Sequence, residues 1–214
     1  MSVNVKVVAT AKVFDEKKIA DLDEKRLVPK MMLRRRLTRA GKIVVYLSDR
    51  CGFENGPIVY GSAFGELQAT ADIVGAIAED VSISPTAFQN SVYNTAPSYF
   101  SILQENRHEI LTLSSGNSTS DDVLSTAALQ AVTFGNEILL VCTETMDIPN
   151  IEEVNTCSDY LEMGMACRVV VTDEAANVTV TKKEHAGFPP SVWAILDLID
   201  ACEGHENPVV ELQL

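Results

Sequence analysis

The sequence predicts a layered α/β protein, and two observations indicate this fold class. Short apolar segments at Pro57–Ser62, Ile110–Ser114 and Glu137–Thr143 have the length and continuous hydrophobicity of strands that are buried on both faces. Segments with helical spacing of apolar residues lie between them, including Gly65–Asp80 and Ser120–Phe134. Strands that alternate with helices indicate a mostly parallel sheet with helices on both faces.

Two N-terminal segments extend this pattern. The valines of Ser2–Phe14 alternate with polar residues, which predicts a strand. Met31–Asp49 has apolar residues three and four positions apart, so we expect one long amphipathic helix there.

The C-terminal third is less regular. Residues 144–164 are acidic, contain Pro149 and show no clear period, so we expect a long loop. We expect Met165–Thr172 and Asn177–Lys183 to form a hairpin. Pro189–Cys202 predicts a helix, and Pro208–Leu214 is a candidate for the last strand.

The most informative stretch runs from Ser84 to Thr119. Ser84 and Pro85 are typical of a helix start. The strand Ile110–Ser114 is followed at once by the small residues Ser115–Thr119 and then by a helix. Strand, tight turn and helix together are the geometry of a nucleophile elbow, which presents a side chain at a helix N-terminus. An ordinary β–α connection is the alternative.

Composition and charge limit the possible functions. The chain has 214 residues and a net charge of −13, and we expect a single domain spanning residues 1–214. Residues 1–50 hold 13 of the 17 Lys and Arg but only 6 of the 30 Asp and Glu, so they carry +7 and the remainder −20. This balance disfavours binding to nucleic acid.

Targeting and metal signals are also weak. We expect no membrane insertion, because no run of about twenty apolar residues occurs. The N-terminus does not resemble a signal peptide, so we expect a cytoplasmic protein. Five cysteines without a CxxC pair argue against a disulfide framework or a zinc site, and we expect neither metal nor cofactor.

Five segments carry a resemblance to a known family. They are MMLRRRLT (31–38), IVYGSAFGEL (58–67), SPTAFQNSVYN (84–94), TLSSGNS (112–118) and ILLVCTE (138–144). Together they resemble the N-terminal half of the β-ketoacyl synthases in the thiolase-like superfamily. The chain is more similar still to the short synthase-like and chain-length-factor-like proteins of aryl polyene and fatty-acid-like pathways. The resemblance implies a thiolase-like half with a mostly parallel five-stranded sheet and Ser120–Phe134 as its buried, Ala-rich helix.

The resemblance also implies that a catalytic residue is missing. The turn carries a nucleophilic cysteine in the active family, and aligning TLSSGNS with that turn puts Asn117, or a neighbour within one residue, in its place. The family also uses two histidines from a C-terminal half, and this sequence ends before such a half would begin. Because an amide cannot form a thioester, we expect no condensation by this chain alone.

Binding residues follow from the same resemblance. It implies that Phe88, Tyr93, Asn94 and Phe100 line the groove that holds an acyl chain, with core packing as the alternative for the aromatic residues. Acyl carrier proteins are acidic, so four arginines are candidates for a contact with one. They are Arg34, Arg35, Arg36 and Arg39. Pairing with the acidic remainder of the chain is the alternative.

We therefore expect a non-catalytic or accessory synthase-like subunit. It would bind a full-length β-ketoacyl synthase, an acyl carrier protein or both, as a homo- or heterodimer, because a lone half leaves apolar surface open. The alternative is a thioester hydrolase or acyltransferase that uses Ser115 or Ser118 with a histidine, although helix capping by Ser118 or Asn117 is the stronger interpretation. A third option is an interaction protein whose pocket has closed. We expect the three histidines at the surface; they are His108, His185 and His205.

Overall fold

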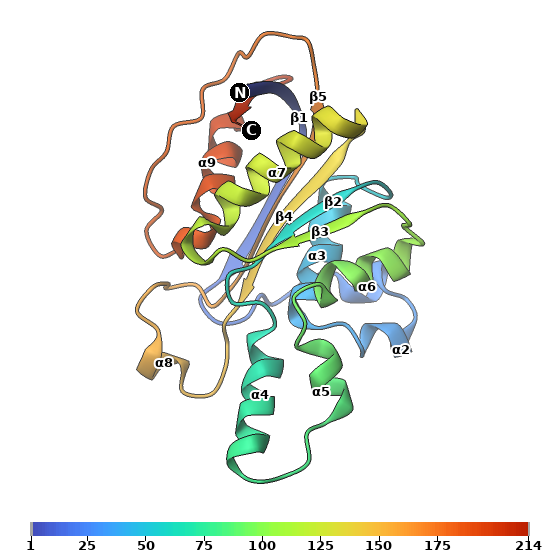
Figure 1. Cartoon of the computed structure of the whole chain (residues 1–214), viewed down its shortest axis with the longest axis vertical. Coiled ribbons are helices and arrows are strands. Elements are labelled where there is room, and N and C mark those ends of the chain that lie inside the picture. Colours follow the sequence, from blue (N-terminus) through green and yellow to red (C-terminus); the bar gives the residue numbers. More distant parts are fainter. Residues whose placement is uncertain (1, 214) are drawn as a thin grey trace.

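A six-stranded sheet divides the molecule into two apolar cores (Figure 1). This computed structural model describes residues 2–213. The strands are β1 (Ser2–Asp15), β2 (Ile58–Gly61), β3 (Ile110–Leu113), β4 (Ile138–Thr145), β5 (Glu162–Val171) and β6 (Val209–Gln213). Their order across the sheet is β3-β2-β4-β5-β1-β6. Helices cover both faces, so the predicted layered α/β class is confirmed.

The sheet is mixed, and the prediction of five mostly parallel strands was wrong in number and direction. Strand β2 pairs in parallel with β3 and β4, whereas the pairs β4–β5, β5–β1 and β1–β6 are antiparallel. The parallel strands are joined by long helical crossovers. Residues 146–161 join β4 to β5 with only the short helix α8 (Ile151–Val154), which returns the chain antiparallel to β4.

Helices α3 (Arg39–Arg50) and α6 (Thr95–Gln104) cover one face of the sheet, and α7 (Thr119–Phe134) and α9 (Trp193–Cys202) cover the other (Figure 1). The backbone of α3 comes close to β5, because a Cβ atom on Gly164 would lie 2.3 Å from Ile43 Cγ2. Helix α7 buries Val123, Ala127, Ala128 and Ala131 completely. Its other side leaves Leu129, Val132 and Phe134 half exposed.

The single helix predicted for Met31–Asp49 is broken. The chain forms the short helix α1 (Glu24–Leu27), then α2 (Met31–Arg34), and α3 begins only at Arg39. The Thr38 hydroxyl group accepts a hydrogen bond from the Gly41 amide at 3.0 Å and so caps the start of α3. The periodic spacing of apolar residues continues through Thr38, but this capping residue starts a new helix there.

The predicted hairpin of Met165–Thr172 and Asn177–Lys183 is also wrong. Strand β5 pairs with β4 on one edge and β1 on the other, so no edge remains for residues 177–183. These residues lie in the connection between β5 and α9, in which Val178 makes one isolated bridge to Val210. The expected loop at 144–164 is shorter, because β4 extends to Thr145 and β5 begins at Glu162.

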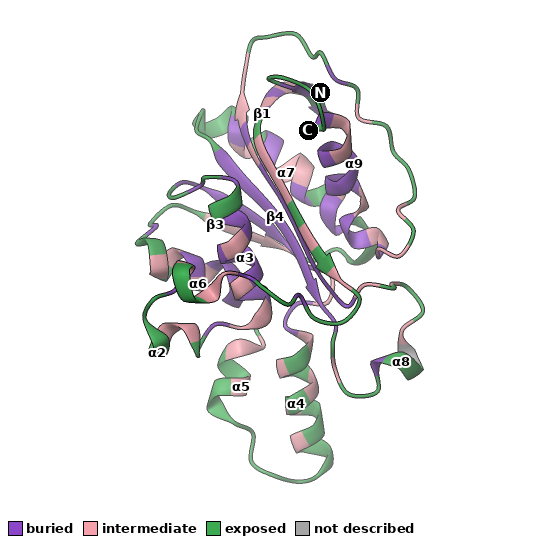
Figure 2. Cartoon of the chain, turned by 180° about the vertical axis from the view of Figure 1, so that it is seen from behind, coloured by how far each residue is buried: buried purple, intermediate pink, exposed green. Residues whose placement is uncertain are grey.

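Helices α4 (Leu67–Ala78) and α5 (Pro85–Asn90) project from the body as an arm (Figure 1). Figure 2 shows that most of this arm is exposed. Its exposed large apolar side chains are Val74, Ile77, Val81, Ile83 and Phe88. An exposed apolar surface of this kind is typical of a contact region. Among the described residues, no helix combines the length and hydrophobicity needed to cross a bilayer.

Candidate functional site

The end of β3 and the start of α7 form the predicted elbow. Strand β3 ends at Leu113, a short 3-10 helix η1 (Gly116–Ser118) follows, and α7 begins at Thr119. Gly116 has a φ of +56°, a conformation that glycine adopts without strain. Asn117 is exposed immediately before the first turn of a 16-residue helix. The structure therefore retains the strand–turn–helix geometry that the sequence predicted.

Thr119 stabilises this turn through its side chain. Its hydroxyl group donates to the Gly116 carbonyl oxygen at 2.7 Å and accepts from the Ser115 amide at 3.1 Å. Ser118 occupies the N-cap position of α7 without a capping bond from its side chain. The predicted capping by Ser118 or Asn117 was therefore wrong. Thr119 belongs to the run Ser115–Thr119 that the sequence placed in this turn, although the prediction of capping singled out Ser118 and Asn117 instead.

A buried carboxylate lies at the end of the neighbouring strand β4. Glu144 accepts hydrogen bonds from the Ser62 hydroxyl group (2.8 Å), the amides of Ala63 (2.7 Å) and Phe64 (3.1 Å), and the Ser191 hydroxyl group (2.8 Å). Burial raises the pKa of Glu144, while these donors act in the opposite direction. The carboxylate therefore fixes the loop after β2 and the 3-10 helix η2 (Pro190–Val192), and η2 lies beside η1.

The cysteines lie away from the elbow in sequence, and most of their thiols are buried. Burial raises the pKa of Cys51 to about 12 and that of Cys202 to about 11, and it also raises the pKa values of Cys142 and Cys167. These four thiols stay protonated near neutral pH, which makes them poor nucleophiles. Cys157 is exposed, in the connection between β4 and β5.

The four candidate acyl-groove residues lie in different environments. Phe100 is fully buried, and its ring stacks on that of Phe53 with 6.0 Å between the centroids. Phe88 is 65% exposed and Tyr93 is 41% exposed, and Asn94 is also exposed. Phe100 is therefore part of the core, and an acyl groove lined by these residues stays a prediction.

The candidate arginines separate into two pairs. Arg39 donates to the buried carboxylate of Glu162 through Nε at 2.8 Å, and Arg34 donates to the Val28 carbonyl oxygen at 2.8 Å. Arg35 and Arg36 are exposed. They line a groove of about 400 Å³ between α2, α5 and α6, together with Leu33, Tyr99 and Ile102. Only the second pair is available to a partner without breaking internal contacts.

The histidines do not complete a nucleophilic triad in this structure. His185 is mostly buried, and its Nε2 atom lies 2.9 Å from Asp197 Oδ1, so its predicted surface position was wrong. His108 and His205 are exposed. Within residues 2–213 no histidine ring is hydrogen-bonded to a serine hydroxyl group. The same residues contain no group of three His, Cys, Asp or Glu side chains arranged to hold a metal ion.

The fold and the elbow define a class of protein, and comparison with known families identifies it. Residues 12–191 match the family described as β-ketoacyl synthase, N-terminal domain. The chain therefore belongs to this family, which confirms the resemblance noted in the sequence. No curated protein matches the chain.

Solved structures support the same fold. The structure of the ketosynthase ApeO in complex with its chain length factor ApeC from Xenorhabdus doucetiae is similar over 95% of this chain and 93% of the matched chain, with 19% identity and a TM-score of 0.72. The ishigamide ketosynthase/chain length factor matches with 14% identity and a TM-score of 0.60, over 81% of this chain and 63% of that chain.

A third similar structure is AntDE:AntF, a type II polyketide synthase acyl-carrier protein in complex with its ketosynthase bound to the hexaketide. It matches with 13% identity and a TM-score of 0.61, over 79% of this chain and 62% of that chain. This chain thus spans under two thirds of the second and third matched chains, but nearly all of the first. At these identities the likeness establishes the thiolase-like ketosynthase fold.

Proposed function

We propose that this chain is an accessory, non-catalytic ketosynthase-like subunit in fatty-acid-like or polyketide-like biosynthesis, of which aryl polyene synthesis is one kind. One observation carries the proposal. The elbow is intact, and it presents Asn117 where the resemblance places the cysteine nucleophile. An amide side chain does not form an acyl thioester, so condensation requires the cysteine of another subunit.

The similar structures support a paired arrangement. One contains a ketosynthase with its chain length factor, and another contains a ketosynthase with its acyl-carrier protein. These are properties of those proteins, and we propose a corresponding partner for this chain: a full-length, cysteine-bearing ketosynthase. We propose a heterodimer with that partner, with a homodimer as the alternative state.

Strand β3 offers a specific surface for such a partner. It pairs only with β2 in the described chain, so its other edge is free. The Ile58 amide donates to the Glu109 carbonyl oxygen and the Ser62 amide to the Leu113 carbonyl oxygen. Glu109 and Leu113 therefore direct their backbone groups toward β2. Because successive residues of a strand direct their backbone groups to opposite edges, the backbone amide of Thr112 points to the free edge. Unpaired strand edges bind further strands through their backbone groups.

The helices that precede and follow β3 in the chain also carry exposed apolar side chains. Ile102 lies on α6, the helix that precedes β3 in the chain, and is 61% exposed. Leu129 is 55% exposed on α7, which contacts β3. We propose that the partner strand pairs with β3 and that the partner covers these side chains.

The test uses two variants of one edge residue. The tagged chain is purified from its source cells, any bound ketosynthase is identified by mass spectrometry, and the purified pair is then measured by size-exclusion chromatography. Thr112→Pro removes the outward amide at a position where an edge strand tolerates proline, whereas Thr112→Val keeps that amide. We expect a one-to-one complex with the ketosynthase. Its affinity should be unchanged by Thr112→Val and should fall at least tenfold with Thr112→Pro. Leu129→Glu provides a second disruptive variant.

Two results would contradict the proposal. One is the absence of any ketosynthase in the purified material. The other is a condensation product from the chain alone.

An acyl carrier protein is the second proposed partner. Arg35 and Arg36 are exposed beside Met31 and Met32, which are 52% and 72% exposed. Exposed cations next to an apolar patch fit an acidic protein with an apolar docking helix. Reversing both charges with Arg35→Glu and Arg36→Glu should weaken carrier binding at least tenfold. Arg107→Glu, a charge reversal in the exposed connection between α6 and β3, should leave it unchanged; the opposite pattern would exclude this contact.

The alternative function stays a prediction without support from the site. A hydrolase or acyltransferase that uses Ser115 or Ser118 needs a base near its hydroxyl group. Within residues 2–213 neither serine is hydrogen-bonded to a histidine. The cytoplasmic location and the single domain over residues 1–214 are likewise expectations.

A further inference from the structure

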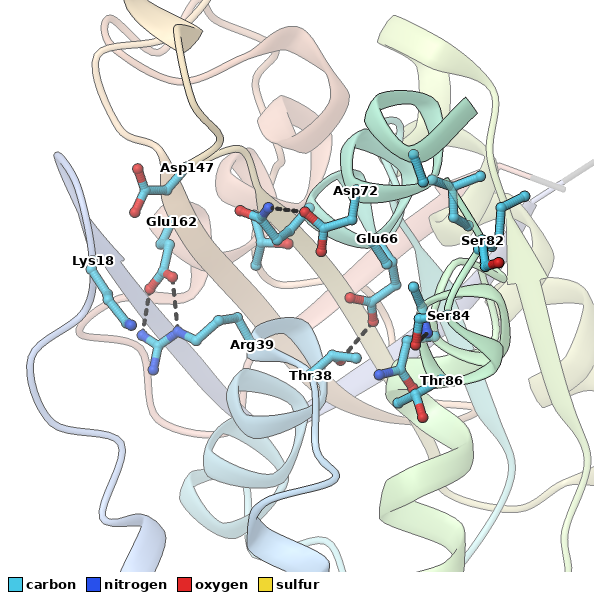
Figure 3. Close-up of a pocket in the computed structure, with 18 residues that line it drawn as sticks. Lys18, Thr38, Arg39, Glu66, Asp72, Ser82, Ser84, Thr86, Asp147 and Glu162 are labelled. Atoms are coloured by element: carbon cyan, nitrogen blue, oxygen red, sulfur yellow. Dashed lines mark hydrogen bonds and ion pairs between the residues drawn. The ribbon is translucent and has the colours of Figure 1, made fainter. Parts of the chain in front are cut away.

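A cavity of about 630 Å³ lies between the arm and the body of the molecule (Figure 3). Helices α4 and α5 and their connection form one wall. The start of α3 and residues at the ends of β4 and β5 form the other. This volume lies in the range of about 300–1,000 Å³ that is typical of small-molecule sites.

Glu66 is a buried acid on this cavity. It is only 6% exposed, and Oε1 accepts a hydrogen bond from the Thr38 hydroxyl group at 2.7 Å (Figure 3). Within residues 2–213 no Lys, Arg or His side chain forms an ion pair with it, and Oε2 has no hydrogen-bond donor. A buried carboxyl group without a counter-ion is costly, so it favours a ligand that supplies a charged donor.

The other charged groups around the cavity leave it acidic. Arg39 and Glu162 pair with each other, as the dashed lines in Figure 3 show. The remaining charged groups of the lining are Asp72 on α4, Asp147 after β4, and Lys18 after β1. Together with an ionised Glu66, three acids face one lysine. The field of such a cavity attracts cations.

The arm also contributes apolar side chains to the lining of this cavity. Ile73 and Ala76 of α4 line the cavity, and Ile83 lines it from the connection to α5. A ligand that uses both walls has a cationic end and a short apolar body.

We propose that this cavity binds a small amphipathic amine, with its ammonium group on the Glu66 carboxylate and its apolar part against Ile73 and Ile83. The proposal goes beyond the accessory function and does not depend on it. Loss of a ketosynthase partner leaves it intact, and loss of amine binding leaves the partner proposal intact.

Protonation of Glu66 gives the proposal a distinctive signature. Burial raises the pKa of Glu66 to about 7. A bound ammonium group stabilises the ionised carboxylate, so binding releases a proton when Glu66 starts protonated. Alkylamines stay protonated up to about pH 10, so only the protein group titrates near neutral pH.

Isothermal titration calorimetry with hexylamine tests this site at pH 6 and pH 8. The ionised fraction of Glu66 rises from about one tenth at pH 6 to about nine tenths at pH 8. We therefore expect the Kd of hexylamine to be about tenfold lower at pH 8 than at pH 6. Hexanol and hexanoate are the matched uncharged and anionic probes, and both should bind at least tenfold more weakly than hexylamine at pH 8. Equal affinity for hexanol, or no saturable binding of hexylamine, would overturn the proposal.

A variant pair locates the effect. Glu66→Gln keeps the side-chain shape and removes the charge, so hexylamine affinity at pH 8 should fall at least tenfold and lose its pH dependence. Glu152→Gln changes an exposed glutamate on α8, outside the cavity lining, and should behave as the unmodified chain. Unchanged affinity in Glu66→Gln would overturn the proposal. The pH dependence of the unmodified chain remains an independent test if that variant does not fold.

Discussion

Ser191 Oγ donates a hydrogen bond to Glu144 Oε1 at 2.8 Å, and this contact joins the end of β4 to the turn before α9. The same carboxylate holds the loop after β2 through Ser62, Ala63 and Phe64. One buried side chain thus connects three segments that are distant in sequence. Because η2 contacts η1, these bonds also support the elbow that presents Asn117.

Removing this carboxylate should destabilise the fold strongly. Glu144→Ala leaves four donors without their acceptor, and each buried unpaired donor costs about 1–3 kcal/mol. We expect the free energy of unfolding in urea to fall by about 3 kcal/mol or more. Glu152→Ala, at an exposed position, should change it by less than about 0.5 kcal/mol. Similar values for both variants would show that Glu144 does not support these segments.

Glu66 should make stability depend on pH. Its pKa is raised from 4.5 to about 7 in the folded chain, so the folded state binds a proton that the unfolded state releases between these values. Stability from this group is therefore present below about pH 4.5 and is lost as pH rises to about 7, by roughly 3 kcal/mol in total. The difference in the free energy of unfolding between Glu66→Gln and the unmodified chain should therefore shift in favour of the variant between pH 5 and pH 8. A pH-independent difference between the two proteins in urea unfolding would refute this assignment.

Two glycines in different packing environments should respond oppositely to alanine. A Cβ atom on Gly164 would meet Ile43 Cγ2 at 2.3 Å and Leu47 Cδ1 at 2.8 Å, so Gly164→Ala should cost about 2–3 kcal/mol by forcing α3 away from β5. Gly75 lies in α4, and apart from its chain neighbours and the nearby backbone of its own helix no atom lies within 4 Å of the position that its Cβ atom would take, so Gly75→Ala should stabilise by about 0.5–1 kcal/mol. Thermal unfolding of both variants checks the signs, and a stable Gly164→Ala variant would contradict the close packing.

The elbow should activate a thiol placed in it. In a Cys157→Ser background, which removes the exposed cysteine, Asn117→Cys puts a thiol at the N-terminus of α7. A thiolate is stabilised there, so its pKa should fall by about one unit or more. Thr133→Cys puts the control thiol in the last turn of the same helix. The pH midpoint of iodoacetamide alkylation should be lower for Asn117→Cys, and equal midpoints would show that the turn is not an activating elbow.

The sequence predicted elements whose own residues determine them. The continuous apolar run at Glu137–Thr143 located β4 to within two residues, and the Ala-rich pattern located α7. The small residues before α7 located the elbow. These are local signals, because strand burial and helix periodicity depend on adjacent residues.

The predictions that were wrong concern features that depend on contacts between residues distant in the chain. Residues 177–183 alternate as a strand does, but both edges of β5 are already paired. His185 is hydrogen-bonded to Asp197 on α9, and the Glu66 carboxyl group to Thr38, 28 residues earlier. Neither partner could be predicted from periodicity. The cavity beside Glu66 likewise depends on residues distant in the chain, because the arm lines one side of it and the body the other.

The most direct test of the central claim is the intact mass of the purified chain after incubation with hexanoyl-acyl carrier protein. A cysteine-bearing ketosynthase serves as the positive control and gains one hexanoyl group. We predict that this chain keeps its unmodified mass, because the family resemblance places Asn117 at the position of the nucleophile and the four buried thiols stay protonated. A hexanoyl adduct that disappears in Ser115→Ala or Ser118→Ala would contradict the account and identify the chain as an acyl-transferring enzyme.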